Sequence, residues 1–126
     1  MKLPSKQYDM PDWTTGTPAL RYQSCGTCDS VWYFVRTFCP RCGTRPPVTH
    51  AATGRGVVYA ATVVHRAPSQ RLSAHVPYTL LLVDAAEGFR LMAHGSAGLA
   101  IGDPVQVAFR PFCDALVPHF TKDSRP

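Results

Sequence analysis

The chain has 126 residues, of which 45% are hydrophobic and 17% charged, a composition typical of a soluble globular protein. This length allows one ordinary domain, or one small domain plus a short segment that is held together by cross-links or a metal ion. Its formal net charge of +5 is mild, and no run of about five or six like charges indicates a dedicated nucleic-acid tail. No apolar run approaches the ~18–20 residues that span a bilayer, and the N-terminus lacks the apolar core of a signal peptide. We therefore expect a cytoplasmic protein that does not act at a membrane.

Residues 1–20 are expected to form an N-terminal arm. Prolines at positions 4, 11 and 18 disfavour long regular elements there. A helix fits residues 12–20, but Gly16 and Pro18 would keep it short.

Residues 21–47 contain four of the five cysteines, in the stretch SCGTCDSVWYFVRTFCPRCGT. Each C-x-x-C pair makes a tight turn that directs two sulfurs at one point. The ten-residue connection between the pairs is long enough for a hairpin, and residues 31–35 (VWYFV) are a suitable strand for it. The predicted ligands are Cys25, Cys28, Cys39 and Cys42.

Four soft thiolate ligands with no open position predict a structural, tetrahedral zinc site. Gly26 and Gly43 would let backbone amides fold back toward the sulfurs. A segment of ~30 residues is below the ~40 at which a chain usually folds on its core alone, so the ion would order it. Four thiolates around one divalent ion would also reduce the net charge to roughly +3.

Three other chemistries could use the same sulfurs. Two disulfides would need an oxidising compartment, which nothing in the sequence indicates. Iron is a chemical competitor, because CPRCG also suits a rubredoxin-type centre, although the second half of the chain has no evident role in electron transfer. A catalytic zinc would need a position open to water, which four cysteines do not leave.

After the Pro46–Pro47 pair, which disfavours helix and suggests a linker, the sequence is typical of strands. Five segments rich in β-branched, aromatic or alternating apolar residues are expected strands: 54–67, 77–86, 88–95, 103–110 and 114–120. Turn residues separate them, and Pro118 would confine the last strand to an edge or a bulge. Residues 48–126 are therefore predicted to form a small closed or nearly closed barrel.

The remaining reactive side chains are expected to be structural. Cys113 is the spare cysteine, and a single thiol in an apolar strand is most often a small buried hydrophobe. Activation would need a histidine or a helix N-terminus beside it, so we predict no catalytic residue. The histidines have no metal-like spacing and are expected to be surface or satisfied residues: His50, His65, His75, His94 and His119.

Taken together, the two halves of the chain resemble the DUF35 family, in which a rubredoxin-like zinc ribbon is followed by an OB-fold. The resemblance covers about residues 10–121 and rests on these stretches in order: ALRYQSCGTC, FCPRCGT, GRGVVYAATVVHRAP, PYTLLLVD, GFRLMAHG, IGDPVQVAFR and PHF. It implies a mainly β fold with a rubredoxin-like zinc ribbon at residues 21–47 and a five-stranded OB-fold barrel at residues 48–126.

The resemblance also implies an accessory role in acyl-CoA metabolism. The chain would be a non-catalytic member of a hetero-oligomer that docks on and supports a thiolase-like enzyme, in acyl transfer or thiolytic cleavage within lipid or aromatic metabolism. The ribbon would hold structural Zn²⁺, and the barrel would help to bind or channel acyl-CoA, a ligand shared with the partner. A MaoC-type enoyl-CoA hydratase is the alternative partner.

Two sets of residues suit these contacts. The loop after the first barrel strand brings cationic side chains to the barrel rim, where arginine matches phosphate geometry, and the expected CoA contacts are His65, Arg66, Arg71 and Tyr78. A ribbon this thin cannot bury all its rings, so a docking surface for the partner is expected at Trp32, Tyr33, Phe34 and Phe38. The alternatives are a solvated loop for the first set and packing of ribbon against barrel for the second.

A single-stranded nucleic-acid module is a competing interpretation, because zinc ribbons and OB-folds both bind single strands. It requires stacking aromatics and a continuous basic groove. The expected central strands instead carry aliphatic residues: Leu80, Leu81, Leu82, Leu91 and Met92. We therefore expect no nucleic-acid partner, and a small iron redox carrier is the third hypothesis.

Overall fold

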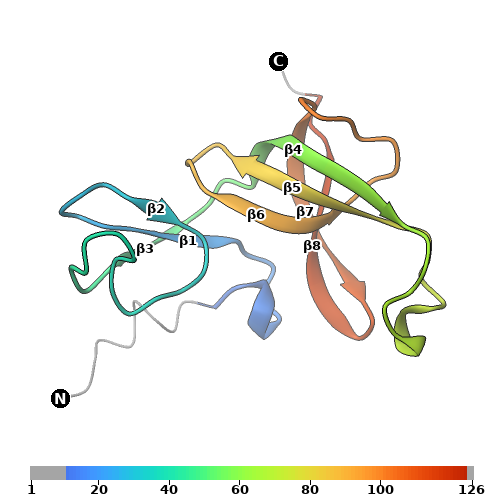
Figure 1. Ribbon diagram of the computed structural model, residues 1–126, viewed down its shortest axis with the longest axis horizontal. Coiled ribbons are helices and arrows are strands. Elements are labelled where there is room, and N and C mark those ends of the chain that lie inside the picture. Colours follow the sequence, from blue (N-terminus) through green and yellow to red (C-terminus); the bar gives the residue numbers. More distant parts are fainter. Residues whose placement is uncertain (1–10, 125–126) are drawn as a thin grey trace.

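The computed structural model describes residues 11–124, which form two β-sheet bodies that lie side by side along the long axis of the molecule (Figure 1). The first body is a three-stranded sheet in the order β2-β1-β3, and the second is a closed barrel in the order β4-β5-β6-β8-β7. The predicted fold class is confirmed: a cysteine-bearing ribbon is followed by a five-stranded, OB-like barrel. Within residues 11–124, no helix is long and apolar enough to cross a bilayer.

The N-terminal body contains one short 3-10 turn and three strands: η1 (Trp13–Thr15), β1 (Arg21–Ser24), β2 (Val31–Trp32) and β3 (Val48–Ala51). The Asp12 carboxylate accepts the N–H of Thr14 at 2.9 Å, and Gly16 ends the turn with a φ of 92°. Because the capped turn ends at once in a left-handed residue, the helix expected over 12–20 is confined to a single turn.

The ribbon sheet differs from the expected hairpin in two respects. The strand expected over residues 31–35 is only two residues long, and the chain leaves the sheet at Tyr33. β1 pairs antiparallel with β2 on one side and with β3 on the other. Since β3 begins directly after Pro47, the hydrogen-bonded ribbon sheet extends past the proline pair to Ala51.

The barrel contains all five expected strands, with ends shifted by a few residues: β4 (Arg55–Val64), β5 (Tyr78–Ala85), β6 (Arg90–Gly95), β7 (Pro104–Phe112) and β8 (Ala115–Lys122). The loop between β4 and β5 includes a second 3-10 turn, η2 (Gln70–Leu72). Hairpins join β4 to β5, β5 to β6 and β7 to β8, and β4 pairs with β7. The barrel closes through a parallel contact of β6 with β8.

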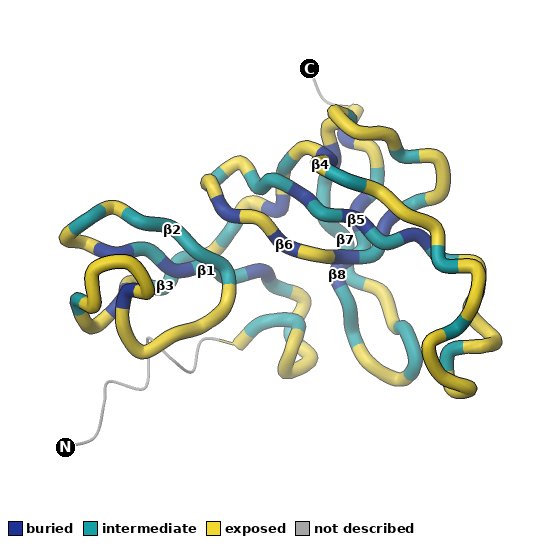
Figure 2. Tube along the Cα trace, viewed as in Figure 1, coloured by how far each residue is buried: buried dark blue, intermediate teal, exposed yellow. Residues whose placement is uncertain are grey.

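The barrel core follows from the period-two alternation of apolar residues along the strands. Along β5 and β6, buried residues alternate with partly or fully exposed ones (Figure 2). The inward-facing side chains meet those of the other strands in one cluster: Val58, Leu81, Val83, Leu91, Ala93, Val105 and Phe120.

The last hairpin refines two sequence expectations. Pro118 pairs with Phe109 of β7 and lies just before the two residues of β8 that pair with β6, so its missing N–H interrupts no ladder on that side.

Cys113 does not lie in an apolar strand: with Asp114 it forms the tip of the β7–β8 hairpin, and the two residues have φ values of 49° and 65°. Two consecutive left-handed residues are what a tight two-residue hairpin turn requires.

Stacked rings join the ribbon to the barrel. Phe89, in the β5–β6 turn, is only 4% exposed. Its ring stacks on Tyr22 at a centroid distance of 5.0 Å and on Tyr33 at 5.5 Å. Tyr33 Oη accepts the indole N–H of Trp13 at 2.6 Å, and burial raises the pKa of the Tyr33 phenol. The two bodies therefore share a packed aromatic interface.

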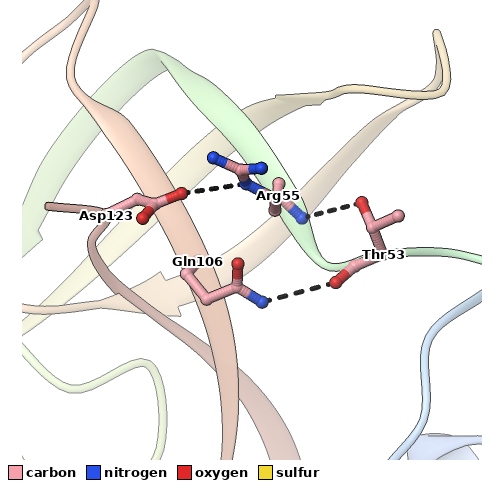
Figure 3. A network of polar contacts seen from close by, with 4 residues as sticks. All are labelled: Thr53, Arg55, Gln106 and Asp123. Carbon is pink, nitrogen blue, oxygen red and sulfur yellow. Dashed lines mark hydrogen bonds and ion pairs between the residues drawn. The ribbon is translucent and has the colours of Figure 1, made fainter. Parts of the chain in front are cut away.

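Polar contacts also hold residues 52–54, which connect β3 of the ribbon to β4 of the barrel (Figure 3). The carbonyl oxygen of Thr53 accepts Nε2 of Gln106 at 3.3 Å, and its backbone N–H donates to the carboxylate of Glu87 at 2.8 Å. Arg55 Nε donates to the buried carboxylate of Asp123 at 3.0 Å. Side chains of β7 and of the β5–β6 turn thus hold the connection at Thr53, and Asp123 holds the first residue of β4 directly after it.

Candidate functional site

The four ribbon cysteines converge as their spacing predicts. All four Sγ atoms lie within 4.8 Å of one another. Sγ of Cys25 is 3.5 Å from Sγ of Cys42, and Sγ of Cys28 is 3.6 Å from Sγ of Cys39. Zinc–sulfur bonds of about 2.3 Å in a tetrahedron would separate the sulfurs by about 3.8 Å, so the cluster has the size of a four-thiolate metal site.

The two C-x-x-C turns have the same backbone hydrogen bonds. Cys25 N–H donates to the Ser30 carbonyl at 2.9 Å, as Cys39 N–H does to the Thr44 carbonyl at 2.8 Å. The fifth residue of each turn is left-handed, with a φ of 62° at Asp29 and 80° at Gly43. The expectation is correct for Gly43, whereas in the first turn the left-handed residue is Asp29 rather than Gly26.

The surroundings of Cys25 and Cys28 favour thiolates, whereas the pKa of Cys42 is raised. The hydrogen bonds of Cys42 with Thr44 lower that pKa, but desolvation and the sulfurs of Cys25 and Cys28 outweigh them. Backbone N–H groups of Thr27 and Arg41 lie 3.4 Å from the sulfurs of Cys25 and Cys39. The backbone N–H groups of Cys28 and Thr27 lower the pKa of Cys25. The Ser30 hydroxyl, 3.2 Å from Sγ of Cys28, is the main cause that lowers the pKa of Cys28 to about 6. Because the thiolate is the form that binds a metal, the sulfurs of Cys25 and Cys28 are suited to a cation.

The donor set fits a structural metal ion. Cys25 and Cys39 are buried, and Cys42 is exposed. Four sulfurs around one point leave no position for water or substrate, which is characteristic of structural zinc sites. Among the described residues, no second group of His, Cys, Asp or Glu brings its ligand atoms together in this way. The four cysteines can therefore bind a metal ion.

The four aromatic residues expected at a docking surface lie in different environments. Trp32 donates its indole N–H to Gln23 at 2.8 Å, and Tyr33 packs on Phe89. Phe34 and Phe38 remain 75% and 42% exposed. Tyr33 therefore packs against the barrel, which was the alternative expectation for this set. Phe34 and Phe38 form an exposed apolar surface.

The residues expected to contact CoA lie along the β4–β5 loop. His65 and Arg66 are exposed where the loop begins. Arg71, in η2, donates to the Cys113 carbonyl at 2.9 Å and lies 3.8 Å from the Asp114 carboxylate. Tyr78 begins β5, where its ring contacts His94 and Phe112. Arg71 and Tyr78 therefore meet the same end of the β7–β8 hairpin.

Sequence reasoning missed a group of rings at this end of the barrel. His94, Phe112 and His119 come from three strands and, with Tyr78, line one pocket. The alternation along β6 could have placed His94 on the outer face. Its proximity to Phe112 depends on where the β7–β8 hairpin lies, for which the sequence carries no local signal.

Comparison with known proteins finds a family model and a relative that match parts of this chain. Residues 49–110 match the family described as ChsH2, C-terminal OB-fold domain. A DUF35 domain-containing scaffold protein of Methanocaldococcus jannaschii is 29% identical over 91 residues, which cover 68% of this chain. The match spans 64% of the length of that relative.

Solved structures agree with this assignment. The structure described as Ltp2-ChsH2(DUF35) aldolase matches with a TM-score of 0.69 at 28% identity and covers 82% of this chain and 84% of its own. A DUF35 protein of unknown function from Sulfolobus solfataricus has a TM-score of 0.58 at 10% identity, covers 83% and 76% of the two chains, and shows the shared fold alone. The cysteine ribbon, the closed barrel and these matches together support assignment of the chain to the DUF35 family.

Proposed function

We propose that the chain is a non-catalytic subunit that docks on and supports a thiolase-like enzyme acting on acyl-CoA. The observation that carries this proposal is the exposed apolar loop that follows β2, with Phe34, Val35 and Phe38, called here the ribbon tip. Their exposed fractions are 75%, 56% and 42%. Grouped exposed apolar side chains mark protein interfaces, and this group stands on a ribbon that the barrel holds in place.

The names of the relatives support the same role. The similar structure joins a DUF35 chain with Ltp2 in an aldolase, and the relative from Methanocaldococcus jannaschii is named a scaffold protein. The two matches cover 68% and 82% of this chain. We infer that this chain likewise serves a larger enzyme.

Charge around the ribbon tip indicates the kind of surface it would meet. Arg36, Arg41 and Arg45 are exposed, and no acidic residue occurs between positions 30 and 83. The Arg45 guanidinium lies 6.0 Å from the centroid of the Phe38 ring. A partner surface with an apolar depression and carboxylates at its edge would complement this tip.

For the metal site we propose zinc, held by the four cysteines. When bound, the ion would link the two C-x-x-C turns and order a ribbon too small to fold on its own core. It would supply no reactive position. The activity would therefore belong to the partner enzyme, and the zinc would fix the geometry of the ribbon tip.

We propose that the barrel end near η2 helps to guide the CoA thioester. Arg71 and Tyr78 are placed there, and His65 and Arg66 lead into the same loop. An arginine at a barrel rim suits a phosphate. The nearby Cys113 has its Sγ 3.8 Å from the Arg71 carbonyl oxygen rather than beside a base, which supports a chain without a nucleophile of its own.

Co-expression with the thiolase-like and the MaoC-type subunits of the same genome tests this function. We expect one of them to co-purify with the chain and to gain solubility and turnover from it. The function is wrong if both candidate enzymes are fully soluble and fully active without the chain. If the MaoC-type subunit is the one that depends on it, the thiolase assignment is wrong.

A pair of matched variants tests the ribbon tip as the docking surface. Phe34→Asp should reduce co-purification at least about tenfold, since a charge would enter the buried interface. Ile101→Asp changes a side chain that is 74% exposed on the barrel and should leave co-purification unchanged. Equal losses in both variants, or none in Phe34→Asp, would exclude the ribbon tip as the docking surface.

A further inference from the structure

A cluster of rings lies at the end of the barrel beside the β7–β8 hairpin. Phe112 is its centre: its ring centroid is 4.3 Å from that of His94, 4.7 Å from His75 and 5.2 Å from Tyr78. These rings come from the β4–β5 loop, β5, β6 and β7. Contacts between the loop and the hairpin tip, from Arg71 to the Cys113 carbonyl, hold the cluster together.

A pocket of about 240 Å³ opens beside this cluster. Tyr78, His94, Phe112 and His119 contribute to its walls. Its cause is the way the barrel closes: β8 pairs with β6 only at His119 and Phe120, whereas the rest of the hairpin pairs with β7 alone. The hairpin therefore leaves β6 at this point, and a space lined by rings remains between the two strands.

One polar atom of a residue that lines the pocket is covered and lacks a partner. Nε2 of His119 is buried and has no hydrogen bond to any described residue. A buried polar group without a partner is costly, and most such groups in proteins are paired with protein or water. Burial lowers the pKa values of His94 and His119, so both imidazoles are neutral near pH 7 and can each accept one hydrogen bond.

We propose that this pocket binds one planar aromatic ring that carries a hydrogen-bonding group on its edge. Rings in the walls offer edge-to-face and stacked contacts to a flat guest, which they would prefer to a flexible aliphatic chain. The polar edge would pair with the imidazole of His119. The site is separate from the cysteines and from the ribbon tip. It shares Tyr78 with the barrel end proposed above to guide CoA, but the argument for it rests on the rings and on His119 and not on that role.

Two small probes of similar size test the ligand class on the intact chain. Phenol has a hydroxyl on its ring and toluene has none. In titrations followed by NMR, phenol should saturate the pocket at millimolar concentration and bind about tenfold more tightly than toluene, because only phenol can pair with the imidazole. The shifted resonances should be those of Tyr78, His94, Phe112 and His119. Absence of saturation, equal binding of both probes, or shifts elsewhere would overturn the proposal.

Variants separate the ring contacts from the hydrogen bond. His119→Phe keeps a ring and removes the nitrogens, so it should bring phenol and toluene to within about threefold of each other. Phe112→Leu should weaken both probes, and Ile101→Ala, at an exposed side chain outside the pocket lining, should change neither. Retained preference for phenol in His119→Phe would exclude the assigned hydrogen bond. If that variant does not fold, the comparison of the two probes on the unaltered chain remains decisive.

Two further probes distinguish where the ring would come from. Adenosine represents a soluble nucleotide, and N-acetyltyrosinamide represents a side chain of a docked protein. Tighter binding of either one with shifts at His119 supports the site and identifies the source. Failure of both, in a chain that still co-purifies with its enzyme, would overturn this proposal and leave the proposed function intact.

Discussion

The ring of Tyr33 in the ribbon lies nearly parallel to the ring of Phe89 in the barrel, with 10° between their planes and 5.5 Å between their centroids. Tyr22 stacks on the same Phe89 at 5.0 Å. A single barrel residue thus packs against two strand-end positions of the ribbon, and the orientation of the ribbon tip depends on it.

Phe89→Ala should destabilise the protein by about 3–5 kcal/mol, since it removes a fully packed ring and leaves a cavity between the two bodies. Urea unfolding measures this change. The matched control is Phe34→Ala, at a position that is 75% exposed, where we expect a change within about 0.5 kcal/mol. Similar losses at both positions would mean that the ribbon is not packed against the barrel as described.

Metal analysis of the purified chain should give one zinc per chain, and a strong chelator should remove it with loss of the ribbon sheet. The barrel has its own core and should keep its amide signals. Cys39→Ser should lower the metal content, whereas Cys113→Ser should not, because Cys113 lies on the far hairpin. A ribbon that keeps its signals without metal would show that the ion is not structural. Visible absorbance from bound iron would contradict zinc.

Asp123→Asn should cost about 1–3 kcal/mol, because the Asp123 side chain is 6% exposed and accepts Arg55 Nε at 3.0 Å. The control is Asp84→Asn, which breaks the ion pair with Arg90. Both side chains of that pair are 47% exposed, so we expect a change of about 0–1 kcal/mol. The denaturant midpoints of the two variants measure their losses of stability. Equal losses would show that the buried carboxylate of Asp123 stabilises the fold no more than the exposed ion pair of Asp84 does.

Stability should fall as the pH drops below about 6.5 because of His94 and His119. Burial lowers the pKa of His94 from its usual 6.5, and burial together with Arg110 and His94 lowers that of His119. The unfolded chain then takes up protons at a higher pH than the folded chain does, so the contribution is complete above pH 6.5 and is lost on acidification toward the lowered pKa values.

Unfolding free energies of the natural chain and of the double variant His94→Phe, His119→Phe, measured across this pH range, test that expectation. The double variant should lose less stability between neutral and acidic pH. Parallel curves for the two proteins would show that these imidazoles do not titrate differently in the folded and unfolded chains.

The features that sequence predicts here are those encoded locally. The spacing of the cysteine pairs is enough to place four sulfurs together, and the β-branched, aromatic and alternating apolar residues are enough to predict the five barrel strands. Asp29 was not predicted as the left-handed residue of the first C-x-x-C turn, because aspartate indicates that conformation less strongly than glycine does.

The features that sequence does not predict depend on how distant segments meet. Tyr33 was expected at a docking surface, and its packing on Phe89 follows from the angle between ribbon and barrel. The pairing of Arg55 with Asp123 joins residues 68 positions apart. The contact of His94 with Phe112 requires a hairpin that reaches over the end of β6. No periodic pattern or fixed spacing in the sequence predicts any of these contacts.

The parallel contact between β6 and β8 also bears on the order in which the barrel assembles. Three hairpins connect strands that are neighbours along the chain, whereas the contact of His94 with His119 and that of Gly95 with Phe120 join two of those hairpins. Short-range pairs form early in folding, and long-range closure comes later because it carries the greater loss of chain entropy. The pairing of β4 with β7 is of longer range still. We expect both long-range pairings to close after the hairpins, and the two-residue contact of β6 with β8 to exchange its amide protons ahead of the neighbouring hairpins.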